Sequence, residues 1–157
     1  MIDDVSGHYE VTSCVLSVER ESARVADPGH GAIATFVGVV RNHAGVERTG
    51  VTSIYYEAFA EMAEKKMAEI GAALLSRHAQ GKRMRISIVH RVGELVVGDA
   101  SVVIAIGCER RKESLAACAE AIERLKENVP VWKKERFRDG SEWVGWAGDP
   151  PSTHPKR

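Results

Sequence analysis

The sequence has few of the residues and segments that mark specialised classes of protein. Its 157 residues include three cysteines, Cys14, Cys108 and Cys118, which are widely spaced and form no C-x-x-C pair. An odd number of isolated cysteines argues against a disulfide framework or a zinc site and indicates a reducing cytoplasm. No apolar run approaches the roughly 20 residues that a membrane-spanning helix requires.

The chain also lacks an excess of charge of either sign. Its 22 lysines and arginines are balanced by 22 aspartates and glutamates. This balance argues against binding of nucleic acid or an acidic membrane over the whole surface, but it allows a local basic patch. The first residues, MIDD, do not lead into the apolar core of a signal peptide. Glycine-rich phosphate loops, G-x-S-x-G and H-E-x-x-H are absent, so the common nucleotide, hydrolase and metalloprotease sites are not indicated.

What is present is the composition of an ordinary globular domain. Hydrophobic residues make up 44% of the chain, and a fold of about 150 residues buries roughly 68–70% of its unfolded surface. The length predicts a single domain, which we place over residues 1–147. Residues 148–157 (GDPPSTHPKR) hold three of the five prolines and are expected to form a disordered tail, and residues 1–8 are expected to fray.

Strand-like and helix-like segments alternate, with connections of uneven length. β-Branched and aromatic runs predict strands at residues 11–18, 31–40, 51–57, 85–92 and 101–107, a turn or short hairpin at 93–98 and a hairpin over 132–146. Helices are predicted at residues 19–26, 58–78 and 113–128. The expected apolar stripes are Phe59, Met62, Met67, Ile70 and Leu74 on the second helix and Leu115, Cys118, Ile122 and Leu125 on the third. This order predicts an α+β domain with a mixed or antiparallel sheet and two long helices, rather than a doubly wound parallel sheet.

Basic residues gather at the ends of these predicted elements. They are Arg41, Arg110, Arg111, Lys126, Lys133 and Lys134. Arginine binds phosphate in a bidentate manner and lysine binds it as a point charge, and a lysine held among other cations becomes a usable base or nucleophile. If these side chains converge, the sequence predicts a site for an anionic substrate and a proton-transfer or acyl-linked reaction.

Each member of this set also has a purely structural explanation. Arg110 and Arg111 can form a solvated helix start, although cations there oppose the helix dipole, and Lys126 is a favourable partner of the dipole at a helix end. The stems of Lys133 and Lys134 can cover an aromatic ring. Pattern alone therefore indicates a possible anion site and names no reaction.

Three other residues could carry chemistry but have simpler roles. His90 lies on one side of the strand predicted at 85–92, together with Ile86 and Ile88, and a histidine in a strand is more often a core or surface residue than a ligand. Cys118 lies on an apolar stripe and is expected in the core, and Cys108, near arginines, is either a core residue or a more reactive thiol.

Four blocks between residues 31 and 144 carry a more specific pattern. They are residues 35–43 (TFVGVVRNH), residues 56–59 (YEAF) with Met62, Ala63 and Lys65, residues 90–99 (HRVGELVVGD), and residues 125–135 (LKENVPVWKKE) followed by Asp139-Gly140 and Trp143-Val144. In this order and spacing they resemble the large-subunit family of molybdopterin synthases, and the fourth block is the most specific.

The resemblance implies an α/β hammerhead-type fold and a cytoplasmic homodimer in which each copy binds one small ubiquitin-like subunit, giving a heterotetramer. The C-terminal Gly-Gly of that partner carries a thiocarboxylate. Two sulfur transfers to cyclic pyranopterin monophosphate then produce the dithiolene of molybdopterin in molybdenum cofactor biosynthesis. The resemblance implies no metal or other cofactor in this subunit.

The matching blocks also imply the site residues. Lys126 corresponds to the catalytic lysine of the family and Lys133 to a second essential lysine, and Arg111 corresponds to an arginine that the neighbouring copy contributes. The residues implied to contact the substrate are Val39, Val40, Arg41, Arg110, Arg111, Lys126, Lys133, Lys134 and Glu135.

Arg110 departs from the family pattern, which has histidine at this position. Arginine keeps a donor and a positive charge but cannot exchange a proton near neutral pH. One alternative is therefore a non-catalytic family member that binds the ubiquitin-like tail or the pterin. Another, from a different class, is a small nucleic-acid-binding domain that uses the basic and aromatic segment 132–146. Zero net charge and the acidic residues within that segment argue against the second alternative.

Overall fold

The computed structural model describes residues 1–46 and 48–147. The tail expected at 148–157 lies outside the described residues, and the single domain over residues 1–147 stays a prediction. In chain order the elements are β1 (Ile2–Asp3), β2 (Gly7–Thr12), α1 (Val18–Val25), β3 (Ala32–Val39), β4 (Val51–Ala58), α2 (Ala60–Leu74), the π-helix η1 (Leu75–Ala79), β5 (Met84–Arg91), β6 (Gly93–Val96), β7 (Ala100–Cys108), α3 (Arg111–Asn128), β8 (Val131–Phe137) and β9 (Glu142–Trp146).

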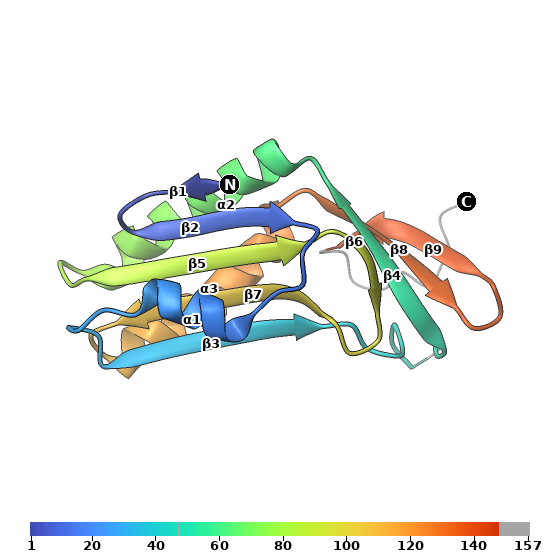
Figure 1. Ribbon diagram of the computed structural model, residues 1–157, viewed down its shortest axis with the longest axis horizontal. Helices are drawn as coiled ribbons and strands as arrows, with labels where there is room; N and C mark the ends of the chain where they lie inside the picture. The colour runs from blue at the N-terminus through green and yellow to red at the C-terminus, as the bar shows by residue number, and fades with distance from the viewer. Residues whose placement is uncertain (47, 148–157) are drawn as a thin grey trace.

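Two sheets organise these elements. The larger sheet has the strand order β1-β2-β5-β7-β3 and the smaller sheet the order β6-β4-β8-β9. Strands β2 and β5 run parallel, and the other neighbouring pairs are antiparallel. In Figure 1, α1 covers one face of the larger sheet, α2 and α3 cover the other, and the smaller sheet extends from one end. The expected α+β class with two long helices is confirmed.

The hydrophobic core lies between the larger sheet and the two long helices. On β5, Met84, Ile86 and Ile88 are buried and face Met67 and other apolar residues of α2 and α3. Side chains on a strand alternate between its two faces. The next residue in this row is therefore His90, so the apolar row ends in a polar side chain at the end of the sheet.

The apolar stripes of the long helices are shorter than predicted. The buried residues of α2 are Ala63, Glu64, Met67, Ile70, Gly71 and Leu74. Phe59 and Met62 are exposed, because Phe59 precedes the helix and Met62 lies about 140° around the helix axis from Met67. On α3, Leu115 is exposed, whereas Cys118 and Leu125 are buried.

Several expectations for shorter segments are wrong. Residues 1–8 do not fray: Ile2 and Asp3 pair with Tyr9 and His8 in an antiparallel ladder. The strand expected at 11–18 ends at Thr12, whose side chain accepts a hydrogen bond from the Cys14 N–H at 3.1 Å; such local bonds compete with a strand ladder. Ser17 then caps α1. The turn or short hairpin expected at 93–98 begins with strand β6, which pairs with β4.

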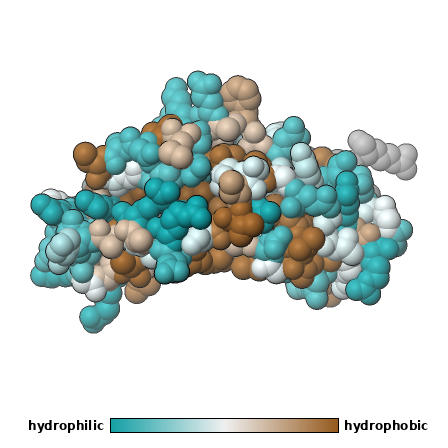
Figure 2. Space-filling view, in the orientation of Figure 1, coloured by the Kyte–Doolittle hydropathy of each residue, from teal (hydrophilic) through white to brown (hydrophobic). Residues whose placement is uncertain are grey.

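On the face shown in Figure 2, hydrophilic residues cover both ends, and hydrophobic residues reach the surface near the middle. In the part of the chain that the structure describes, no helix is both long enough and apolar enough to cross a membrane.

Candidate functional site

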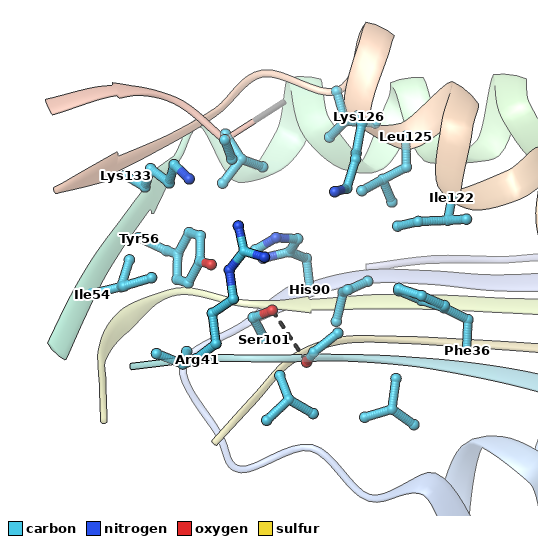
Figure 3. Close-up of a pocket in the computed structure, with 18 of the residues that line it drawn as sticks. Phe36, Arg41, Ile54, Tyr56, His90, Ser101, Ile122, Leu125, Lys126 and Lys133 are labelled. Carbon is cyan, nitrogen blue, oxygen red and sulfur yellow. Dashed lines mark hydrogen bonds between the residues drawn. The ribbon is translucent and has the colours of Figure 1, made fainter. Parts of the chain in front are cut away.

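A cavity of about 340 Å³ opens at the end of the larger sheet, next to the smaller sheet (Figure 3). Its walls come from the end of β3 and the following loop, from β4 and β8, from the last turns of α3, and from the adjoining ends of β5 and β7. Its lining includes Phe36, Gly38, Val39, Val40, Arg41, His43, Ile54, Tyr56, His90, Ser101, Ile122, Leu125, Lys126, Val131, Lys133 and Glu135.

Three basic side chains from distant segments reach this cavity. Arg41 follows β3, Lys126 lies in the last turn of α3 and Lys133 is on β8. Figure 3 shows them around the space between the sheet and α3. Within residues 1–46 and 48–147, neither Arg41 nor Lys126 forms a salt bridge with a carboxylate. Cations without internal counter-ions around a concave surface attract an anionic ligand.

The third cation, Lys133, is held by a buried carboxylate. Glu135 is 4% exposed, and its Oε1 lies 3.2 Å from Lys133 Nζ while its Oε2 lies 3.3 Å from Arg48 Nη2. The ring centroid of Trp143 lies 4.9 Å from the Arg48 guanidinium and 5.5 Å from Lys133 Nζ, distances at which the ring face attracts cations. The carboxylate and the indole therefore fix Lys133 toward the cavity.

Neutral polar groups complete the lining. His90 is 4% exposed, and its ring meets the Tyr56 ring edge-on with centroids 5.2 Å apart. Burial lowers the pKa of His90 from 6.5 to about 4, so this ring is neutral at pH 7. Burial also raises the pKa of Tyr56. Ser101 Oγ donates to the Gly38 carbonyl at 3.2 Å (Figure 3, dashed line).

Most of the residues implied to contact a substrate do line this cavity. They are Val39, Val40, Arg41, Lys126, Lys133 and Glu135. Lys134 instead points to the opposite face of β8, where its Nζ lies 3.4 Å from Glu142 on β9.

Arg110 and Arg111 lie at the far end of α3 from Lys126. Arg111 begins the helix, and a rise of about 1.5 Å per residue places it about 22 Å from Lys126 along the axis. Within one copy, therefore, Arg41, Lys126 and Lys133 converge, whereas Lys134 and these two arginines do not. A second copy would have to supply Arg110 and Arg111 to such a cavity.

Two cavity residues and one supporting residue were missed as site residues. His90 was placed correctly beside Ile86 and Ile88, and the signal that it belongs to a site is that it ends an apolar row. Tyr56 belongs to the second of the four sequence blocks, but no role was assigned to it. No sequence pattern points to Arg48, because its partner Glu135 is 87 residues away in the chain.

Among the described residues, potential metal ligands are not clustered, and two of the three cysteines are buried. In residues 1–46 and 48–147, no group of three or more His, Cys, Asp or Glu side chains is placed to hold a metal ion. Cys108 and Cys118 are buried, and burial raises the pKa of Cys118 to about 11. The expected core role of Cys118 is confirmed, and Cys108 is a core residue as well.

The sequence and the fold match known proteins. The profile of the MoaE protein family matches residues 11–128. The molybdopterin synthase catalytic subunit of Halalkalibacterium halodurans is 40% identical over 140 residues, which cover 89% of this chain and 86% of that protein.

Solved structures agree with this match. The X-ray crystal structure of molybdopterin synthase from Staphylococcus aureus matches with a TM-score of 0.77 and 34% identity over 87% of this chain and 96% of that one, which confirms the implied fold. A chain in the complex of subunits 1 and 2 of molybdopterin-converting factor from Helicobacter pylori 26695 has a TM-score of 0.65 at 16% identity, over 88% of each chain, and shows likeness of fold alone. Because the family profile covers most of the sequence and a named relative is 40% identical over most of both chains, this chain belongs to the MoaE protein family.

Proposed function

We propose that this chain is the catalytic subunit of a molybdopterin synthase, a sulfurtransferase of molybdenum cofactor biosynthesis. Its substrate is cyclic pyranopterin monophosphate, and the sulfur comes from the thiocarboxylated C-terminus of a small ubiquitin-like subunit. The observation that carries this proposal is the cavity at which Arg41, Lys126 and Lys133 meet, because such a site suits a phosphate ester. Membership of the MoaE family, whose curated relatives are named molybdopterin synthase catalytic subunits, supports it.

In this proposal Arg41 and Lys133 bind the cyclic phosphate. Arg41 offers a planar fork of donors, and Lys133 offers a point charge whose place is set by Glu135. Both stabilise the negative charge that develops as the phosphate ring opens. Since both oxygens of Glu135 already have cationic partners, we assign it to positioning Lys133 rather than to contacting the substrate.

Lys126 is proposed as the acid–base group of the sulfur transfer. In the first transfer, the thiocarboxylate sulfur forms a bond to a substrate carbon as the bond from that carbon to an oxygen of the cyclic phosphate breaks, so the phosphate oxygen is the leaving group. Water then cleaves the acyl C–S bond, leaving a carboxylate on the partner and a thiolate on the pterin. Protons must be moved beside the reacting carbon, and Lys126 lines the cavity without a carboxylate partner among the described residues.

Val39 and Val40 contribute in another way. The backbone N–H and C=O of Val40 are bonded to Asp99 and Gly98 at 2.9 and 2.8 Å. The two valines therefore provide an apolar wall and a rigid end of β3 from which Arg41 projects.

The proposed assembly is a cytoplasmic homodimer that binds two small subunits. If Arg110 and Arg111 serve a substrate site, as the family pattern implies, a second copy must supply them, because they are too far from their own cavity. The Helicobacter pylori fold relative was solved as a complex of two subunits. A nucleic-acid-binding role has less support: Trp143 is buried, and Trp132 and Trp146 contact each other edge-on at 5.3 Å.

The decisive experiment is incubation of the purified chain with a thiocarboxylated small subunit and cyclic pyranopterin monophosphate, followed by mass spectrometry of the pterin. We expect molybdopterin to form with wild type and not with Lys126→Ala. Lys66→Ala serves as a matched control, because Lys66 is an α2 surface residue paired with Glu69 at 3.2 Å. Binding of the pterin without product would identify a non-catalytic family member.

A further inference from the structure

The row of side chains on the face of β5 that packs against the helices changes from apolar to polar at the cavity. Met84, Ile86 and Ile88 pack in the hydrophobic core, whereas His90, next in the row, lines the cavity. The polar atoms of a histidine that is 4% exposed need hydrogen-bond partners from the protein, from water in the cavity or from a ligand, because an unpaired polar group removed from water destabilises the fold.

One ring nitrogen of His90 is satisfied and the other is not. Nδ1–H donates to the backbone carbonyl of Arg91 at 2.8 Å. This bond assigns the proton of the neutral ring to Nδ1 and leaves Nε2 as an acceptor. Within residues 1–46 and 48–147, Nε2 has no hydrogen-bond partner. The edge-on contact with Tyr56 holds the ring from the side, so the acceptor has a fixed place.

The neighbouring groups differ from this acceptor. The hydroxyls of Tyr56 and Ser101 can donate as well as accept, whereas Nε2 of a ring protonated on Nδ1 can only accept. Arg41, Lys126 and Lys133 donate hydrogen bonds and have no acceptor atoms when charged. The oxygens of Glu135 are occupied by its two cationic partners. Because burial lowers the pKa of His90 to about 4, its ring stays an uncharged acceptor at neutral pH.

We infer that His90 is a specificity-determining residue, whose Nε2 accepts a hydrogen bond from an N–H group of the substrate's heterocycle while the basic residues hold the phosphate. This inference rests on the proposed function and extends it. A cavity that offered donors alone would admit any phosphate ester of suitable size. A buried acceptor disfavours a ligand without a donor at that position, since the acceptor would lose water and gain no partner.

The test compares binding of two probes, cyclic pyranopterin monophosphate and inorganic phosphate, by titration calorimetry at pH 7. His90→Phe keeps an aromatic ring against Tyr56 and removes the acceptor, whereas His90→Gln supplies a carbonyl acceptor. We expect His90→Phe to weaken pterin binding about ten- to hundredfold and to change phosphate binding by less than about twofold. His90→Gln should recover part of the lost pterin affinity.

A second measurement does not depend on whether the variants fold. In ¹⁵N-labelled wild type, the His90 Nε2 resonance should shift when the pterin is added and should stay in place when inorganic phosphate is added. Equal pterin affinity of wild type and a folded His90→Phe variant, or an unmoved Nε2 resonance in the pterin complex, would overturn the inference alone. Wild type that binds phosphate but not the pterin would overturn the proposed function and the inference with it.

Discussion

Replacing Glu135 with glutamine tests how the cavity holds Lys133. The side chains of Glu135, Lys133 and Arg48 are 5%, 17% and 19% exposed, so the network is largely removed from water. Glutamine keeps the shape and one acceptor but removes the buried negative charge that lies beside Lys133 and Arg48. Removing one partner of a buried ion pair costs about 3–5 kcal/mol. Because both cations retain some contact with water, we expect Glu135→Gln to destabilise the fold by about 2–3 kcal/mol.

The assay is urea unfolding followed by tryptophan fluorescence at pH 7, with Glu142→Gln as the matched control. Glu142 belongs to the same hairpin and contacts Lys134 and Arg136 at 3.4 and 3.5 Å, but its side chain is 43% exposed. An exposed pair contributes about 0–1 kcal/mol, so the control should be nearly neutral. Equal losses of unfolding free energy in Glu135→Gln and Glu142→Gln would refute the view that a buried charge network fixes Lys133. In the binding assay, Glu135→Gln should also weaken phosphate binding, since Lys133 would no longer be held toward the cavity.

The remaining predictions concern the other cavity residues. Lys126→Arg should retain less than about a tenth of the wild-type single-turnover rate, which is a loss of more than ~1.4 kcal/mol of transition-state stabilisation. The reason is that a guanidinium keeps the positive charge but does not release a proton near neutral pH. A Lys126→Arg variant that is faster than this would show that the role of Lys126 is electrostatic only. Arg111→Ala and Lys126→Ala chains, each inactive alone, should regain activity when mixed, and a strictly monomeric mass in light scattering would contradict this. The pKa of His90 is lowered from 6.5 to about 4 in the fold, so its contribution to stability is present above pH 6.5 and is lost as the pH falls toward 4. Between pH 7 and pH 5, the unfolding free energy of His90→Phe should therefore fall by on the order of 2 kcal/mol less than that of wild type. If urea unfolding shows the same fall in both proteins, this prediction is wrong.

Much of the fold follows from local pattern. The periods of the long apolar segments predicted α2 and α3, and the β-branched runs predicted β3, β4, β5 and β7 close to their observed bounds. The prediction failed where a few polar contacts decide the structure. Ser17 starts α1, and a two-residue ladder holds β1; neither leaves a periodic signal in the sequence.

The polar network of the cavity could not be predicted from chain position. Arg48 lies in a loop without a regular pattern, and its contact with Glu135 depends on how β4 and β8 pair in the smaller sheet. His90 shows the opposite case, because its place in the row was predicted while its role was not. The alternation of a strand tells which face a residue takes, but only the packed structure tells where the core ends and a cavity begins.

The prediction that the basic residues converge on one site holds for only part of the set. The chain leaves β3 and α3 beside the smaller sheet, so Arg41 and Lys126 meet Lys133 there. Arg110 precedes α3 and Arg111 begins it, at the other end of an 18-residue helix from Lys126, and no rearrangement short of breaking that helix brings them to the same cavity. They are therefore either a solvated helix start or part of the site of another copy. The mixed-variant experiment separates these two roles, because a solvated helix start would leave Arg111→Ala active on its own.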